Sequence, residues 1–173
     1  VTNSRDWHDV YSAAIYAGLN GYEYNYVIEE TQGLEIINLW DRDIDEVILI
    51  SPQTNGYLSG ASTIIESKGL SIKQTINSDE FVNNNIELGK LSGVNKFILV
   101  DDNFGYNAIS VGQYAIKSNS YVVFVNSENT QDVIDLIETS GSVLKSISFR
   151  SITKHYNKIF FKYCPVYDSF IFA

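Results

Sequence analysis

Short, almost wholly apolar runs alternate with longer amphipathic runs along most of this 173-residue chain. Strands that are apolar at successive positions are typical of a parallel sheet, because such a sheet is covered on both faces. Helical patterns separate these runs, so the alternation predicts right-handed βαβ units and an α/β fold. The predicted strands span residues 24–28, 46–50, 70–75, 96–101, 121–125 and 143–149.

The helices between these strands have recognisable start and stop signals. One predicted helix has Asn3 or Ser4 as its cap and Asp6 in its first turn, and another follows Asn103, which can cap that one. Gly69 and Gly93 stand where two further helices should end. Those two helices are predicted at residues 57–68 and 79–91, and two more are predicted at residues 33–40 and 130–139.

The chain also contains an internal repeat. The segment that starts at Val1 aligns with the segment that starts at Val100, with one gap near Arg5. The aligned pairs include Asp9 with Asn107, Ser12 with Ser110, Tyr16 with Tyr114 and Ala17 with Ala115. The alignment predicts a duplicated strand-helix-strand-helix-strand unit, in which small residues let each first helix lie close on its own sheet. It places Val1 at the end of a strand, so we expect the chain to derive from a larger precursor.

These segments resemble the type 2 cell-wall-binding repeat of bacterial and archaeal surface proteins. Residues 103–126, NFGYNAISVGQYAIKSNSYVVFVN, are closest to that pattern, and residues 6–28 match it more loosely. The linking residues 50–93 follow the family layout as well, with Asp79 and Phe81 at its acidic and aromatic positions. The resemblance implies two tandem βαβαβ-type repeats with parallel, flavodoxin-like three-layer sheets.

The chain departs from the family pattern at several positions. Lys73, Asn77 and Glu80 replace the usual Arg, Gly and second Arg, and neither expected Gly-Gly turn is present. The resemblance covers about residues 1–150. We therefore predict a truncated first repeat at residues 1–51, a linking segment with the second repeat at 52–150, and an aromatic-rich tail at 151–173.

Polar residues follow two strands that the repeat makes equivalent. Ligands of α/β proteins bind where the carboxyl ends of parallel strands meet. The candidate ligand-binding residues are Asn3, Ser4 and Arg5 in the first copy, and Asp101, Asp102 and Asn103 in the second. Helix capping is the alternative role for these side chains.

The charge and the missing motifs exclude several classes of function. A formal net charge of -9 repels phosphate backbones, so nucleic acid is a poor partner. No glycine-rich phosphate loop is present, so we expect no nucleotide and no other cofactor. Asp41, Asp43 and Asp45 alternate as in a calcium loop, but the turn glycine and the final glutamate of such a loop are missing, so no metal is expected.

No arrangement of residues indicates catalysis. His8 and Asp9 are adjacent on a predicted helix and so point to different faces, which makes a poor relay to Ser12. The single cysteine, Cys164, is interpreted as a small buried apolar residue. The alternative is an enzyme of flavodoxin-like fold, such as a hydrolase, with its site at the carboxyl ends of the strands.

The resemblance therefore predicts a non-catalytic module of the cell envelope or surface layer, located outside the cell. Its expected partners are a cell-wall polymer or glycan, or neighbouring surface-layer subunits. No apolar run is long enough to span a membrane. The tail at 151–173 is either packed as terminal strands or used as an aromatic docking surface.

Overall fold

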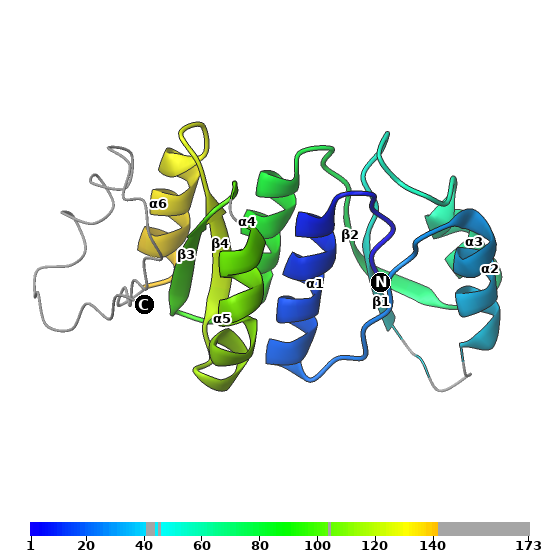
Figure 1. Ribbon diagram of the computed structural model, residues 1–173. Coiled ribbons are helices and arrows are strands. Elements are labelled where there is room, and N and C mark those ends of the chain that lie inside the picture. Colours follow the sequence, from blue (N-terminus) through cyan, green and yellow to red (C-terminus); the bar gives the residue numbers. More distant parts are fainter. Residues whose placement is uncertain (41–43, 45, 104, 142–173) are drawn as a thin grey trace, which may run out of the picture.

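The computed structural model describes residues 1–40, 44, 46–103 and 105–141 (Figure 1). Helices and strands alternate over this part of the chain, and both of its two-stranded sheets are parallel, which confirms the predicted α/β class. The elements are α1 (Trp7–Asn20), α2 (Glu30–Leu39), β1 (Glu46–Ile50), α3 (Ala61–Ser67), β2 (Ser71–Ile76), α4 (Phe81–Leu91), β3 (Phe97–Asp101), α5 (Gly105–Lys117), β4 (Tyr121–Val125) and α6 (Thr130–Thr139).

The first sheet pairs β1 with β2 and gains two single-residue bridges. Thr2 bridges Ile50 on one side and Tyr26 on the other, both in parallel. The order across the sheet is therefore Tyr26, Thr2, β1 and β2. The strand predicted at residues 24–28 is reduced to the bridge at Tyr26, because Thr2 is its only described pairing partner.

The second sheet pairs β3 with β4, and all five residues of β4 are buried. Alternate residues of β4 face opposite layers of helices. Tyr121 packs near Gly89 of α4 and the Leu136 side chain of α6, whereas the Phe124 ring meets the rings of Trp7 and Tyr11 on α1. Helices therefore cover both faces of this sheet.

Helix α1 does not lie on its own sheet, in contrast to the arrangement that the repeat predicted. It packs against α4, α5 and β4 (Figure 1), and its buried residues Ala13, Ile15 and Tyr16 belong to the hydrophobic core that contains β3 and β4. Glycines allow the close approach to α5. A Cβ on Gly112 would lie 3.3 Å from the Tyr11 hydroxyl, and one on Gly105 would lie 3.1 Å from the Trp7 ring. On α1, Gly18 accommodates Ile116 of α5 in the same way.

The Asn85 side chain of α4 makes hydrogen bonds to the backbone of β4 along its outer edge, the edge that does not pair with β3. Its Oδ1 accepts from the Phe124 amide at 3.0 Å, and its Nδ2 donates to the Val122 carbonyl at 3.0 Å. These are the two groups that a neighbouring strand would pair. The same Nδ2 lies 2.9 Å from the Ser12 hydroxyl, so the amide also links this edge to α1.

The structure moves the start of three predicted helices. The helix predicted from residue 57 begins at Ala61, because the Asn3 Oδ1 accepts from the amides of Tyr57 and Leu58 and holds them in a loop. The cap predicted at Asn3 or Ser4 is wrong, since Asp6 caps α1 by accepting from the His8 amide at 2.9 Å. The start predicted at residue 79 shifts to Phe81, and the start predicted at residue 33 moves back to Glu30.

Most other boundaries agree with the prediction. β1, β4 and α6 match their predicted ranges, and β2 and β3 each begin one residue later than predicted. Gly69 and Gly93 follow their helices with positive φ angles of 82° and 67°, as the stop signals predicted.

Several predictions fall outside the described residues. They concern the strand at 143–149, the tail at 151–173, Cys164, and the acidic positions Asp41, Asp43 and Asp45. The division of the chain at residue 51 stays a prediction.

We predict that Asn85→Ala lowers the free energy of unfolding by about 2–4 kcal/mol, because it leaves the Phe124 amide and the Val122 carbonyl buried without their partner. Urea denaturation followed by circular dichroism measures this loss. The matched control is Asn83→Ala on the same helix, where the side chain is exposed and the expected change is within about 0.5 kcal/mol. Equal losses in the two variants would contradict the role given to Asn85.

Candidate functional site

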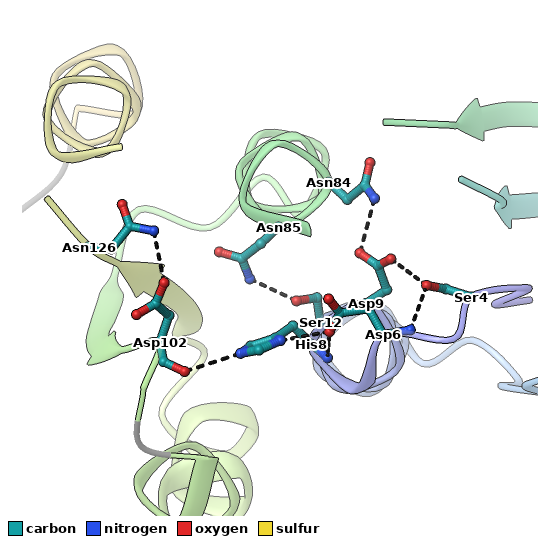
Figure 2. Close-up of polar contacts among 9 residues, drawn as sticks. All are labelled: Ser4, Asp6, His8, Asp9, Ser12, Asn84, Asn85, Asp102 and Asn126. Carbon is teal, nitrogen blue, oxygen red and sulfur yellow. Dashed lines mark hydrogen bonds and ion pairs between the residues drawn. The ribbon is translucent and has the colours of Figure 1, made fainter. Parts of the chain in front are cut away.

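Ser4 and Asp102, one residue from each predicted triplet, are connected through Asp6 and His8 at the start of α1 (Figure 2). The His8 Nε2 lies 3.2 Å from the main-chain carbonyl oxygen of Asp102 at the end of β3. Asn3 and Ser4 precede α1, and Asp101, Asp102 and Asn103 precede α5. We define the carboxyl-end cluster as the nine residues drawn in Figure 2: Ser4, Asp6, His8, Asp9, Ser12, Asn84, Asn85, Asp102 and Asn126.

Asn3 is buried beside this cluster, and the protein itself uses all of its hydrogen-bonding capacity. Its Nδ2 donates to the Ser51 hydroxyl at 3.0 Å and to the Leu58 carbonyl at 2.9 Å. Its Oδ1 accepts from the amides of Tyr57 at 3.0 Å and Leu58 at 2.8 Å. An asparagine amide offers two donors and two acceptor lone pairs, so none is left for a ligand. Asn3 thus ties the start of the chain to the loop after β1.

Ser4 and Asp9 form a buried pair that α4 completes. The Ser4 hydroxyl donates to Asp9 Oδ2 at 2.6 Å and accepts from the Asp6 amide at 3.1 Å. Asn84 Nδ2 donates to Asp9 Oδ1 at 3.0 Å. Burial raises the pKa of Asp9 above its ordinary value, and the hydrogen bonds from Ser4 and Asn84 only partly offset that effect.

His8 pairs with Asp6 rather than with its neighbour Asp9. The His8 Nδ1 lies 2.6 Å from Asp6 Oδ1, and the His8 ring stacks on Phe81 with a centroid distance of 3.9 Å. Burial acts to raise the pKa of Asp6, but the two hydrogen bonds and the charge of His8 outweigh it and hold that pKa below its ordinary value. The sequence does contain a signal for this pair, the spacing Asp-x-His at a helix start, which the prediction from the sequence did not include.

The open part of the site lies after β3 and β4. Asp102 Oδ2 accepts from Asn126 Nδ2 at 2.8 Å, and Asp102 Oδ1 accepts from Asn103 Nδ2 at 2.8 Å. Asn103 also donates from its backbone and side chain to Asp101 Oδ1, at 3.0 Å in each case. Asn103 is exposed, and Asp101 and Asp102 are half-buried. These carboxylates and amides can accept from and donate to the hydroxyl groups of a ligand.

Arg5 is the exposed cation of the predicted site. Its Nε donates to the Gly56 carbonyl at 3.3 Å, and its guanidinium lies 5.0 Å from the centroid of the Tyr57 ring. This contact with an aromatic face holds the charge outside the protein, where an anion or a hydroxyl group can reach it.

Comparison with known proteins provides no relative: no protein-family model, no curated protein and no solved structure matches the chain. In the part of the chain that the structure describes, no three His, Cys, Asp or Glu side chains converge as metal ligands. No helix in that part is long and apolar enough to cross a membrane.

We predict that Asp9 and Asp6 titrate in a set order, although they lie in the same helix start. The pKa of Asp9 is raised by burial and that of Asp6 is lowered by His8, so the Asp9 midpoint lies at higher pH. Carboxyl-carbon NMR shifts recorded across the acid range measure both midpoints, and Asp6→Asn and Asp9→Asn assign the two signals. Coincident midpoints, or the reverse order, would show that the cluster is not packed as described.

We also predict that Asp6→Asn destabilises the protein by about 1 kcal/mol near pH 6, with the difference disappearing in acid. Asn retains the helix cap, so the variant isolates the pairing with His8. Because the pKa of folded Asp6 is lowered, its contribution is present above its unfolded value and is lost as pH falls through the folded one. Urea denaturation at several pH values measures it. The control is Glu66→Gln on α3, an exposed site where no such trend is expected.

Proposed function

We propose that the chain is a non-catalytic cell-surface module that anchors or assembles envelope or surface-layer proteins on the cell wall. The observation that carries this proposal is the use of the buried polar groups. In the carboxyl-end cluster, Ser4, Asp9, Ser12, Asn84 and Asn85 are all buried and hydrogen-bonded to one another or to backbone groups. These buried side chains stabilise the fold, and the accessible side chains around them are left for binding.

The same geometry argues against a catalytic role for the cluster. The Ser12 hydroxyl is fully buried and accepts from Asn85 at 2.9 Å. Both ring nitrogens of His8 are directed elsewhere, one to Asp6 and one to the Asp102 carbonyl. A serine nucleophile needs a base within hydrogen-bonding distance and access to substrate, and Ser12 has neither in the described structure.

The finer architecture that we propose is the pair of tandem βαβαβ-type repeats with flavodoxin-like, three-layer sheets. The contact between α1 and α5 supports it. Trp7 aligns with Gly105 and contacts it, and Gly18 aligns with Ile116 and contacts it. The two helices therefore lie parallel and level with each other, so that equivalent positions are neighbours, as a duplicated unit would arrange them.

The proposed binding surface, called the open rim, comprises two sets of accessible side chains: Arg5 and Tyr57 beside the loop after β1, and Asp102, Asn103 and Asn126 after β3 and β4. Amide, carboxylate and aromatic groups of this kind suit the hydroxyl-rich surface of a glycan. With a net charge of -9, an anionic wall polymer is repelled at long range and must be held by a local cation. Arg5 supplies that cation, and neighbouring surface-layer subunits are the other proposed partner. This role places the protein outside the cell, in the envelope or surface layer.

We predict that the purified chain sediments with protein-free bacterial cell walls, and that Arg5→Glu weakens this binding at least threefold. The reason is that the variant replaces the exposed cation of the rim by an anion. The control is Lys68→Glu, which makes the same change of charge in an exposed residue just after α3 and should leave binding within experimental error.

Two outcomes would count against the wall-binding proposal. One is equal weakening by the two substitutions, which would indicate general charge repulsion rather than a site. The other is no sedimentation with walls together with no self-association in analytical ultracentrifugation, which would remove both proposed classes of partner.

A further inference from the structure

Helix α5 has an apolar outer face. The helix lies beside α1 and against β3 and β4 (Figure 1), and its opposite side is open to solvent in the described structure. The exposed fractions are 89% for Tyr106, 68% for Ile109 and 50% for Tyr114. Exposed apolar side chains that gather on one surface are typical of a contact with another protein.

The same helix carries no negative charge. Among the helices that the structure describes, α5 alone has no Asp or Glu within its bounds, and Lys117 is its one charged residue. The neighbouring helix α1 has a single acidic residue within its bounds, Asp9, which is buried and bound by Ser4 and Asn84. With a net charge of -9, two copies of the chain repel each other over most of their surface. The outer face of α5 is where they can approach without bringing carboxylates together.

The exposed residues of α5 are ordered along the helix. A central stripe follows one face at spacings of four, three and four, and comprises Tyr106, Ser110, Gln113 and Lys117. Ile109 and Ile116 flank this stripe on the side of α1, where Ile116 lies against Gly18. The stripe therefore has an aromatic ring at one end, a cation at the other and two hydrogen-bonding side chains between them.

This order is self-complementary when two copies of α5 pack antiparallel. With a twofold axis at the middle of the stripe, Tyr106 lies opposite Lys117 of the second copy, and Ser110 lies opposite its Gln113. An ammonium group over a phenol ring is attractive, and a serine hydroxyl can form a hydrogen bond with a glutamine amide. The symmetry makes each contact twice, and antiparallel helix dipoles add to the attraction.

We propose that the outer face of α5 is a self-association surface, on which a second copy of this chain packs its own α5 antiparallel about a twofold axis. In this arrangement Ile109 lies beside Ile116 of the second copy, so that both lose contact with water. The inference deepens the proposed function and rests on it, because it assigns the contact with a neighbouring subunit to named residues.

Sedimentation velocity over a concentration series up to about 1 mM tests the surface. The wild-type chain should pass from monomer to dimer, and Ile109→Glu should raise the dimer dissociation constant at least tenfold, because it brings a carboxylate from each copy into an apolar contact. The control is Leu39→Glu at the end of α2, which makes the same change of charge at a residue that is 82% exposed and should leave the constant unchanged.

Disulfide formation tests the antiparallel register. In chains that carry Cys164→Ser, a mixture of the Ser110→Cys and Gln113→Cys variants should form the mixed disulfide at least fivefold faster than either variant forms a disulfide with itself. The reason is that position 110 of one copy lies opposite position 113 of the other. Equal rates in the mixture and in the separate variants would show that the copies do not pair in this register, and the antiparallel arrangement would be wrong.

Two further outcomes would overturn the proposal. One is equal weakening of the dimer by Ile109→Glu and Leu39→Glu. The other is a wild-type chain that stays monomeric at every concentration, which would mean that a different protein or another segment of the chain covers this face. Sedimentation with cell walls, measured on the same wild-type sample, reports separately on the proposed function: a monomer that binds walls would leave wall binding standing and remove the self-association surface.

Discussion

The outer edge of β4 is the constraint on which the rest of the structure depends. A strand edge that is buried but has no neighbouring strand leaves backbone N–H and C=O groups that need other partners. Each such group costs about 1–3 kcal/mol if it stays unpaired. Here one side-chain amide, that of Asn85, takes the place of a strand. Consecutive residues of α4 then position α1: Asn84 binds Asp9 and Asn85 binds Ser12, one helical turn apart. The polar contacts thus determine where α1 lies as well as satisfying the edge.

The position of α1 has opposite effects at its two ends. At its start, the helix brings Asp6 and His8 against β3 and α4, and so closes the polar cluster around buried groups. Farther along, Ala13 and Ala17 of the helix line a cavity over the first sheet, together with Val47 and Ile48 of β1. The polar side chains at the start of α1 are therefore used in hydrogen bonds within the protein.

The sequence was informative where burial alone decides the structure. Runs such as residues 121–125 are apolar at every position, so their strand character and bounds could be predicted directly. Gly69 and Gly93 marked helix ends because a positive φ angle is easy only for glycine. Local patterns of this kind need no knowledge of the partner.

Features that depend on distant partners could not be predicted in the same way. Asn3 has the residue type of a helix cap, but Leu58, far along the chain, binds both ends of its amide. The adjacent Asp9 is the more obvious partner for His8 in the sequence, yet Asp6 holds the ring. The role of Asn85 has no local signature in the sequence, because an asparagine in a helix is more often an exposed residue than a buried partner of a strand edge. Asp101, Asp102 and Asn103 lie at the end of β3, where the sequence predicted a strand end, but their role in ligand binding stays a prediction.

The contacts of α1 also set the order in which the chain can fold during synthesis. Asp9 and Ser12 meet partners more than seventy residues later, at separations of 75 and 73, and Tyr11 bonds to the Ala108 carbonyl at a separation of 97. The helix leaves the ribosome long before β4 exists to receive it. Its apolar face therefore stays exposed to solvent until β4 has been synthesised. Such exposure slows folding and favours aggregation in chains with many distant contacts. A fragment that ends soon after β1 would retain that exposed face permanently.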